Sequence, residues 1–168
     1  EAGKDKIPIA LVKKEKSRLC PLLCQLFNEW LEEGQVPMEL SDSLTVLLFK
    51  KGDNRDICNY RPISLLSCLY KLFTKVLANK IRDILDNEQT PEQAGFRRKY
   101  STTDHIFTLN TVVQTCREYQ KPLFVMFIDY KKAFDSIEYN AVWSSLQEKK
   151  VPWQITRVLM DIYSKGQN

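Results

Sequence analysis

Apolar side chains recur along most of the chain at the spacing of amphipathic helices. The clearest patterns run over residues 19–31 and 69–85. Gly34 is placed to end the first of these helices, and Ser67 is placed to cap the second. A third helix is expected through residues 106–116, with Thr102 or Thr103 as its cap. Further helices are predicted over residues 140–149 and 153–163, with a shorter one over residues 8–16.

Three short segments have the apolar or extended character of strands instead. Residues 44–49 (LTVLLF) predict a buried strand, and a turn cluster follows at residues 50–54. Residues 60–66 are expected to be extended, because Pro62 biases Arg61 away from helical backbone angles. Residues 123–128 (LFVMFI) predict a strand buried on both faces, and residues 91–99 predict a loop. No repeat or linker interrupts the pattern, which indicates one α+β unit.

The composition permits a packed core but does not identify a function. Of the 168 residues, 43% are hydrophobic, and the net charge is +4. That mild surplus fits a nucleic-acid partner without requiring one. We expect an intracellular protein with no membrane partner, since no signal-peptide pattern and no apolar stretch of about 20 residues is present. The five cysteines are odd in number and irregularly spaced, which favours reduced thiols over disulfides.

Asp129 is the residue whose position carries the most chemical information. It directly follows the apolar run that ends at Ile128. A carboxylate at the end of a buried strand is costly unless something compensates its charge, and a divalent cation such as Mg²⁺ does so. From this pattern alone, Asp129 could also be a helix cap or a phosphate acceptor, so three roles remain open.

Four segments extend that pattern. Residues 127–135 (FIDYKKAFD) resemble motif A of reverse transcriptases, which has the form F-x-D-x-x-x-A-F-D. Residues 59–66 (NYRPISLL) and 93–102 (QAGFRRKYST) resemble two further segments of that family, in the family's order. Residues 50–53 (KKGD) resemble the lysine-bearing turn between two fingers strands. Together they resemble the polymerases of non-LTR (LINE-type) retrotransposons, over nearly the whole chain.

The resemblance implies a right-hand polymerase fold of the α+β class, rich in helices and with short antiparallel strands. Residues 1–122 would form N-terminal helices and fingers, and residues 123–168 the first part of the palm, in one continuous unit. The implied activity is RNA-directed DNA polymerisation, in which two Mg²⁺ ions assist nucleotidyl transfer to a primer 3′-hydroxyl. The implied partners are an RNA template, a DNA primer and dNTPs.

The resemblance also implies that part of the site is missing. The family's second acidic motif, an aromatic-Ala-Asp-Asp turn, is not found after Asp135, and the chain begins with Glu1 rather than Met. We therefore expect a fragment that is inactive by itself. The alternative is a non-catalytic, nucleic-acid-binding remnant of a decayed element.

The motif A resemblance implies roles for individual residues. Asp129 would be the catalytic metal ligand, assisted by the backbone carbonyl of Tyr130. Phe134 matches the steric-gate position beneath the deoxyribose, and its alternative role is a core residue. Asp135 belongs to the motif as a structural residue.

The fingers motifs imply contacts with nucleotide and template. Lys50 and Arg61 match positions that grip the triphosphate, although the register leaves Lys51 as an alternative to Lys50. In the segment of residues 93–102, the implied structural residues are Gly95 and Phe96. A nearby basic cluster would contact the template, with cations for phosphates and rings for bases; it comprises Arg97, Arg98 and Lys99, next to Tyr100. The alternative is a solvated loop with Phe96 in the core.

Overall fold

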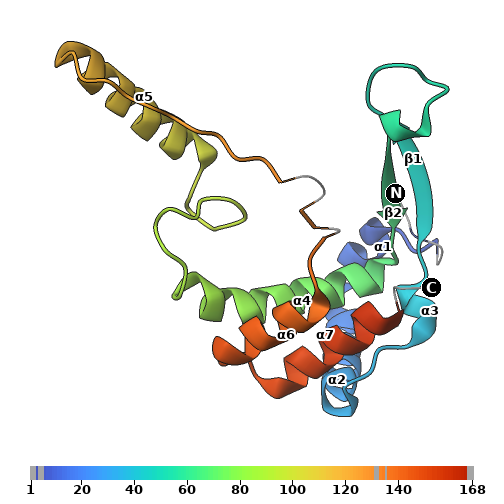
Figure 1. Ribbon diagram of the computed structural model, residues 1–168. Helices are drawn as coiled ribbons and strands as arrows, with labels where there is room; N and C mark the ends of the chain where they lie inside the picture. Colours follow the sequence, from blue (N-terminus) through green and yellow to red (C-terminus); the bar gives the residue numbers. More distant parts are fainter. Residues whose placement is uncertain (1–2, 4–5, 131–132, 135, 166–168) are drawn as a thin grey trace.

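The computed structural model describes residues 3, 6–130, 133–134 and 136–165. It confirms a helix-rich α+β chain with one antiparallel strand pair (Figure 1). The helices are α1 (Ile9–Lys14), α2 (Lys16–Glu33), α3 (Met38–Ser41), α4 (Cys68–Asp86), α5 (Thr102–Glu118), α6 (Tyr139–Glu148) and α7 (Trp153–Lys165). The strands are β1 (Leu44–Phe49) and β2 (Tyr60–Leu65), and the 3₁₀ turn η1 (Ile57–Asn59) precedes β2.

The helix ends follow local signals in the sequence. Gly34 ends α2 in the left-handed conformation at φ 71°. Ser67 caps α4, as predicted, by accepting a hydrogen bond from the Tyr70 amide at 3.1 Å. The predicted cap of α5 is wrong, because neither Thr102 nor Thr103 occupies that position. Ser101 is the N-cap instead, in a reciprocal capping box with Asp104.

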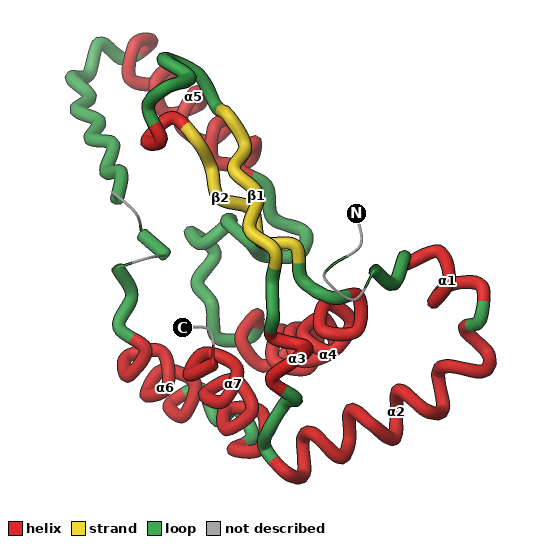
Figure 2. Tube along the Cα trace, turned by 90° about the vertical axis from the view of Figure 1, so that its right-hand side faces the viewer, coloured by secondary structure: helices red, strands yellow, loops and turns green. Residues whose placement is uncertain are grey.

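The core lies where α2, α4, α6 and α7 gather in one layer (Figures 1 and 2). At its centre the rings of Phe27, Trp30 and Phe73 contact one another, with centroids 5.0–5.4 Å apart. Val158 of α7 is fully buried in the same cluster. Elements from both sides of residue 122 therefore share a single core.

The β1–β2 hairpin projects from this layer (Figure 1). Both strands form where they were expected, with Leu44 opposite Leu65 and Phe49 opposite Tyr60. The prediction that residues 44–49 are buried is wrong, since every residue of β1 is exposed. A sheet of two strands supplies no second layer, and no described helix covers either face of this hairpin.

The predicted strand over residues 123–128 is also wrong. This segment is extended but forms no strand, and Phe124 is 94% exposed. A strand requires a neighbour to pair its backbone groups, and the only sheet among the described residues is β1–β2. The preceding helix, α5, has the predicted span but no buried residue, and it extends away from the helical layer (Figure 1).

Two expectations from composition can be compared with the structure. The five cysteines, all of which lie in the described part of the chain, are reduced thiols. In the described part of the chain, no helix is both long and apolar enough to cross a bilayer.

Candidate functional site

The basic end of the hairpin places Lys50 and Arg61 on one face. The Lys50 amide donates to the Asn59 carbonyl at 2.8 Å, so the ladder continues one pair beyond β1. Leu48 lies opposite Arg61 in the register. Side chains alternate between the faces of a strand, so Lys50 lies on the face shared by Leu48 and Arg61. Lys50 and Arg61 are thus diagonal neighbours across the two strands.

The turn that joins the strands is held by several contacts. Gly52 has φ 98°, which a residue with a side chain rarely adopts. A Cβ there would lie 2.9 Å from the side-chain nitrogen of Asn59, Nδ2. Asn59 donates to the Asp53 carbonyl at 2.9 Å, and the Tyr60 hydroxyl donates to the Asn54 carbonyl at 2.8 Å. Lys50 and Arg61 are therefore exposed cations on an ordered hairpin end.

The three cations of the basic loop between α4 and α5 differ in burial and in their contacts. Arg97 is half-buried, and its guanidinium donates to the carbonyls of Thr90 at 2.7 Å and Asp86 at 3.0 Å. Arg98 and Lys99 are exposed, and Arg98 has one contact with the Asn79 side chain at 3.5 Å. The structure therefore leaves two of the three predicted template cations facing solvent.

Phe96 and Phe134 come together, although 38 positions separate them in the chain. Phe96 is 92% exposed and Phe134 is 75% exposed, which excludes a core role for either ring within the described residues. The two rings meet edge to face, with centroids 5.8 Å apart and planes at 86°. Gly95 immediately precedes Phe96, and its carbonyl accepts a hydrogen bond from the Gln93 side chain at 3.1 Å.

The motif A carboxylate lies in the extended segment before Phe134. Asp129 and Tyr130 are both exposed, and Asp135 lies outside the described residues. The Asp129 carboxylate and the Tyr130 carbonyl are oxygen donors of the kind that Mg²⁺ prefers. However, no group of three or more His, Cys, Asp or Glu side chains in the described ranges could hold a metal ion. The described residues therefore do not form a complete metal site.

The structure does not bring the hairpin cations close to motif A. The hairpin and the segment of residues 120–130 do not lie side by side in either view (Figures 1 and 2). What the chain presents is a set of separate parts, namely a basic hairpin end, a basic loop and an exposed carboxylate segment. The loop and the described part of motif A meet through Phe96 and Phe134.

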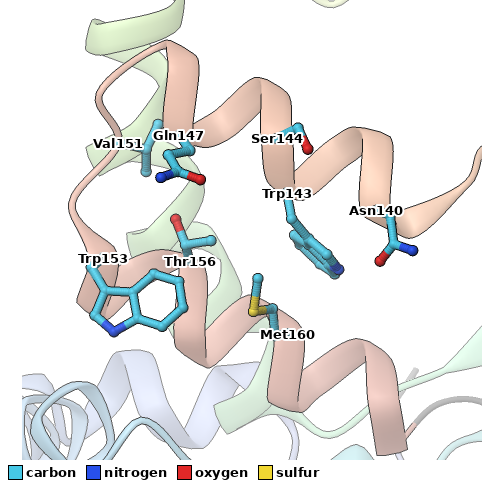
Figure 3. Close-up of a pocket in the computed structure, with 8 residues that line it drawn as sticks. All are labelled: Asn140, Trp143, Ser144, Gln147, Val151, Trp153, Thr156 and Met160. Carbon is cyan, nitrogen blue, oxygen red and sulfur yellow. The ribbon is translucent and has the colours of Figure 1, made fainter.

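A cavity of about 550 Å³ between α6 and α7 was not predicted from the sequence. Trp143 of α6 and Trp153 of α7 line it, with Met160 between them and the amides of Asn140 and Gln147 at its edge (Figure 3). None of the predicted site residues lines this cavity. Because its aromatic and amide residues lie on two helices at no motif-like spacing, the sequence carried no signal for it.

Next to that cavity, three rings pack at the far ends of the same two helices. Trp143 and Tyr139 contact Tyr163, with centroids 5.7 Å and 5.2 Å from its ring. Tyr70 of α4 lines a neighbouring hollow with Tyr139 and Tyr163. Burial raises the pKa of the Tyr70 hydroxyl above its ordinary value, and the nearby Tyr163 adds to this shift.

Comparison with known sequences identifies the family. A family model described as reverse transcriptase (RNA-dependent DNA polymerase) matches residues 49–168. The chain is 31% identical over 140 residues, 82% of its length, to a Pol polyprotein of the type-1 retrotransposable element R2 from Nasonia vitripennis. It is 27% identical over 149 residues, 87% of its length, to a probable RNA-directed DNA polymerase from transposon BS of Drosophila melanogaster. It is also 26% identical over 165 residues to a 149 kDa protein of transposon TX1 from Xenopus laevis.

The chain spans only a small part of these relatives, with matches that cover 13%, 16% and 13% of their respective lengths. The family match includes the hairpin end, the basic loop and the whole motif A segment. It therefore removes the phosphate-acceptor alternative for Asp129, which depended on a different class of protein. The chain belongs to the reverse transcriptase (RNA-dependent DNA polymerase) family.

Proposed function

We propose that this chain forms the fingers and the first part of the palm of an RNA-directed DNA polymerase encoded by a non-LTR retrotransposon. The observation that carries the proposal is the family match over residues 49–168, which contains the four motif segments in order. Under this proposal, residues 1–122 are the helices and fingers, and residues 123–168 begin the palm of a right-hand fold. The partners are an RNA template, a DNA primer and dNTPs, which places the protein inside the cell.

The hairpin supports a role in binding the triphosphate. Arg61 offers a planar fork that matches phosphate oxygens, and Lys50 adds a compact charge on the same face. Lys51 lies in the bend that follows, outside the pairing of the two strands. The pairing register therefore favours Lys50 over Lys51 as the partner of Arg61.

Motif A supports roles in the chemistry and in sugar selection. Asp129 would hold a divalent cation together with ligands beyond those described here, and such a cation stabilises the charge that develops during phosphoryl transfer. The exposed ring of Phe134 is free to lie against a sugar and offers no hydrogen bond to a 2′-hydroxyl. The chain's own contribution is thus to position phosphates, sugar and one carboxylate.

The test is a primer-extension assay on the full-length parent protein, with an RNA template, a DNA primer, dNTPs and Mg²⁺. Asp129→Asn should lower the rate by roughly 10³-fold or more, because it removes a charged metal ligand. Asp83→Asn, at an exposed position on α4, is the matched control and should leave the rate unchanged. A loss of less than tenfold in Asp129→Asn would contradict its role. A wild-type parent that binds RNA but extends no primer would instead support the non-catalytic alternative.

A further inference from the structure

The C-terminal end of α4 lacks the usual capping groups. The last carbonyls of a helix have no partner within it and are often covered by a left-handed glycine or a nearby cation. α4 has no basic residue in its last turn, and its C-cap, Asn87, keeps right-handed helical angles at φ −72°. The Asp86 carbonyl is instead covered by Arg97, 11 residues further along the chain.

Three contacts within the protein hold the Arg97 side chain. Its two terminal nitrogens, Nη2 and Nη1, donate to the Asp86 and Thr90 carbonyls respectively. Its guanidinium carbon lies 4.1 Å from the centre of the Tyr100 ring, a cation–π contact. A bidentate grip on phosphate needs a free pair of N–H groups, and such a grip would compete with these contacts.

The same contacts close the loop on itself. Asp86 and Thr90 lie at its start, and Tyr100 lies at its end, directly before the Ser101 cap of α5. Between them, Phe96 at φ 62° and Lys99 at φ 64° adopt left-handed angles that disfavour residues with side chains. Such angles persist where surrounding contacts fix the backbone, and Arg97 supplies those contacts from inside the loop.

We propose that Arg97 is a positioning residue, which locks the loop so that Arg98 and Lys99 are presented together to the phosphates of the template strand. This inference rests on the proposed function, because it concerns the strand that the polymerase copies. It assigns different roles to three cations that are adjacent in the sequence. Arg98 and Lys99 contact the strand, and Arg97 acts only through them.

The experiment measures binding of the full-length parent protein to an unstructured single-stranded RNA oligonucleotide over a range of salt concentrations. The variant Arg98→Gln/Lys99→Gln should lower the slope of log affinity against log salt by about 1.4, or about 0.7 for each lost phosphate contact. Arg97→Lys keeps its charge but cannot span the two carbonyls and stack on the ring. It should nevertheless lower the slope by a similar amount. Adding Arg97→Lys to the double variant should then change nothing further, because residues that act as one unit are not additive.

Two results would overturn the inference. One is a wild-type slope in Arg97→Lys, which would mean that the loop presents Arg98 and Lys99 without the contacts of the arginine. The other is an additional loss when the three substitutions are combined, which would mean that position 97 contacts phosphate directly. If Arg97→Lys disturbs the fold by circular dichroism, Tyr100 provides a second pair of variants. Tyr100→Leu removes the stacked ring and should lower the slope, whereas Tyr100→Phe keeps the ring and should not. Primer extension by the wild-type protein is measured separately, so failure of the polymerase proposal is distinguishable from failure of this one.

Discussion

Removing the Asp161 carboxylate should release the connector around Val36, which follows α2, from α7. One carboxylate oxygen, Oδ2, accepts from the Val36 amide at 2.9 Å and from the Lys165 ammonium at 2.6 Å. The same ammonium donates to the Val36 carbonyl at 2.6 Å, so both backbone groups of Val36 are bound by α7. Val36 is only 1% exposed, and water cannot replace these partners without opening the core.

The size of the effect follows from that burial. Asp161→Ala leaves a buried amide without an acceptor, which costs about 1–3 kcal/mol. The Asp161 and Lys165 side chains are 17% and 24% exposed, so loss of their ion pair adds only about 1 kcal/mol beyond that. The expected total is about 2–4 kcal/mol, a large share of the roughly 5–15 kcal/mol that stabilises a typical domain. Asp161→Asn keeps an acceptor for Val36 and should cost about half as much.

The assay is urea unfolding followed by circular dichroism, combined with hydrogen exchange at the Val36 amide. Asp161→Ala should lower the unfolding midpoint and abolish protection of that amide, while Asp83→Ala on the exposed face of α4 should change neither. A change below 0.5 kcal/mol, roughly the scatter of ordinary surface substitutions, would refute the reasoning. An Asp161→Asn variant as unstable as Asp161→Ala would show that charge, rather than the acceptor for Val36, holds the connector.

Three further predictions concern separate parts of the chain. In the parent polymerase, Lys50→Ala should raise the dNTP KM several-fold while Lys51→Ala leaves it near wild type; equal effects in steady-state kinetics would contradict the assignment of faces. Phe134→Val should raise rNTP use relative to dNTP use by roughly 5- to 150-fold, because desolvating an unpaired hydroxyl costs about 1–3 kcal/mol; an unchanged ratio of kcat/KM values would remove Phe134 from the site. Burial disfavours the Tyr70 phenolate and so raises the pKa of this hydroxyl; folding stability is therefore fully retained below pH 10.0, the ordinary value, and falls as the pH rises through the folded-state value. Tyr70→Phe should therefore flatten the alkaline loss of stability in unfolding measurements, and an unaltered pH profile would contradict this origin.

Local signals in the sequence were sufficient for most helices. Gly34 and Ser67 define helix ends through backbone angle and side-chain hydrogen bonding, both of which act within a few residues. The cap of α5 was misplaced because Thr102 and Thr103 are themselves good capping residues. The distinguishing signal was Asp104, which stands three residues after Ser101 and completes the capping box.

Burial was harder to predict than secondary structure. Apolarity shows that a run such as residues 44–49 or 123–128 gains free energy by leaving water, but it does not supply the surface that covers the run. In the described residues no second layer lies over β1, and no strand pairs with residues 123–128. The helices α2, α4 and α7 were predicted more reliably because each finds its apolar partner within this chain.

The site shows the same division between local and long-range information. The motifs assigned roles to Lys50, Arg61 and Asp129, which stay predictions, but the sequence could not decide between Lys50 and Lys51, because their difference lies in the strand register. Nor could it separate Arg97 from the cations beside it. That difference comes from the Asp86 carbonyl, which the fold brings to Arg97 from the end of α4.

The residues of the buried core also show which part of the chain belongs to the folded unit. The family match begins at residue 49, but Phe27, Trp30 and Val36 lie before it and belong to the buried core. Fully burying an apolar side chain of this size contributes about 1.5–3 kcal/mol, so these three residues supply a stabilisation comparable to the net stability of a small domain. Without them, Phe73 and Val158, which are 0% exposed in the structure, would face water. The helix before the matched region is therefore an integral part of the unit that carries the polymerase motifs.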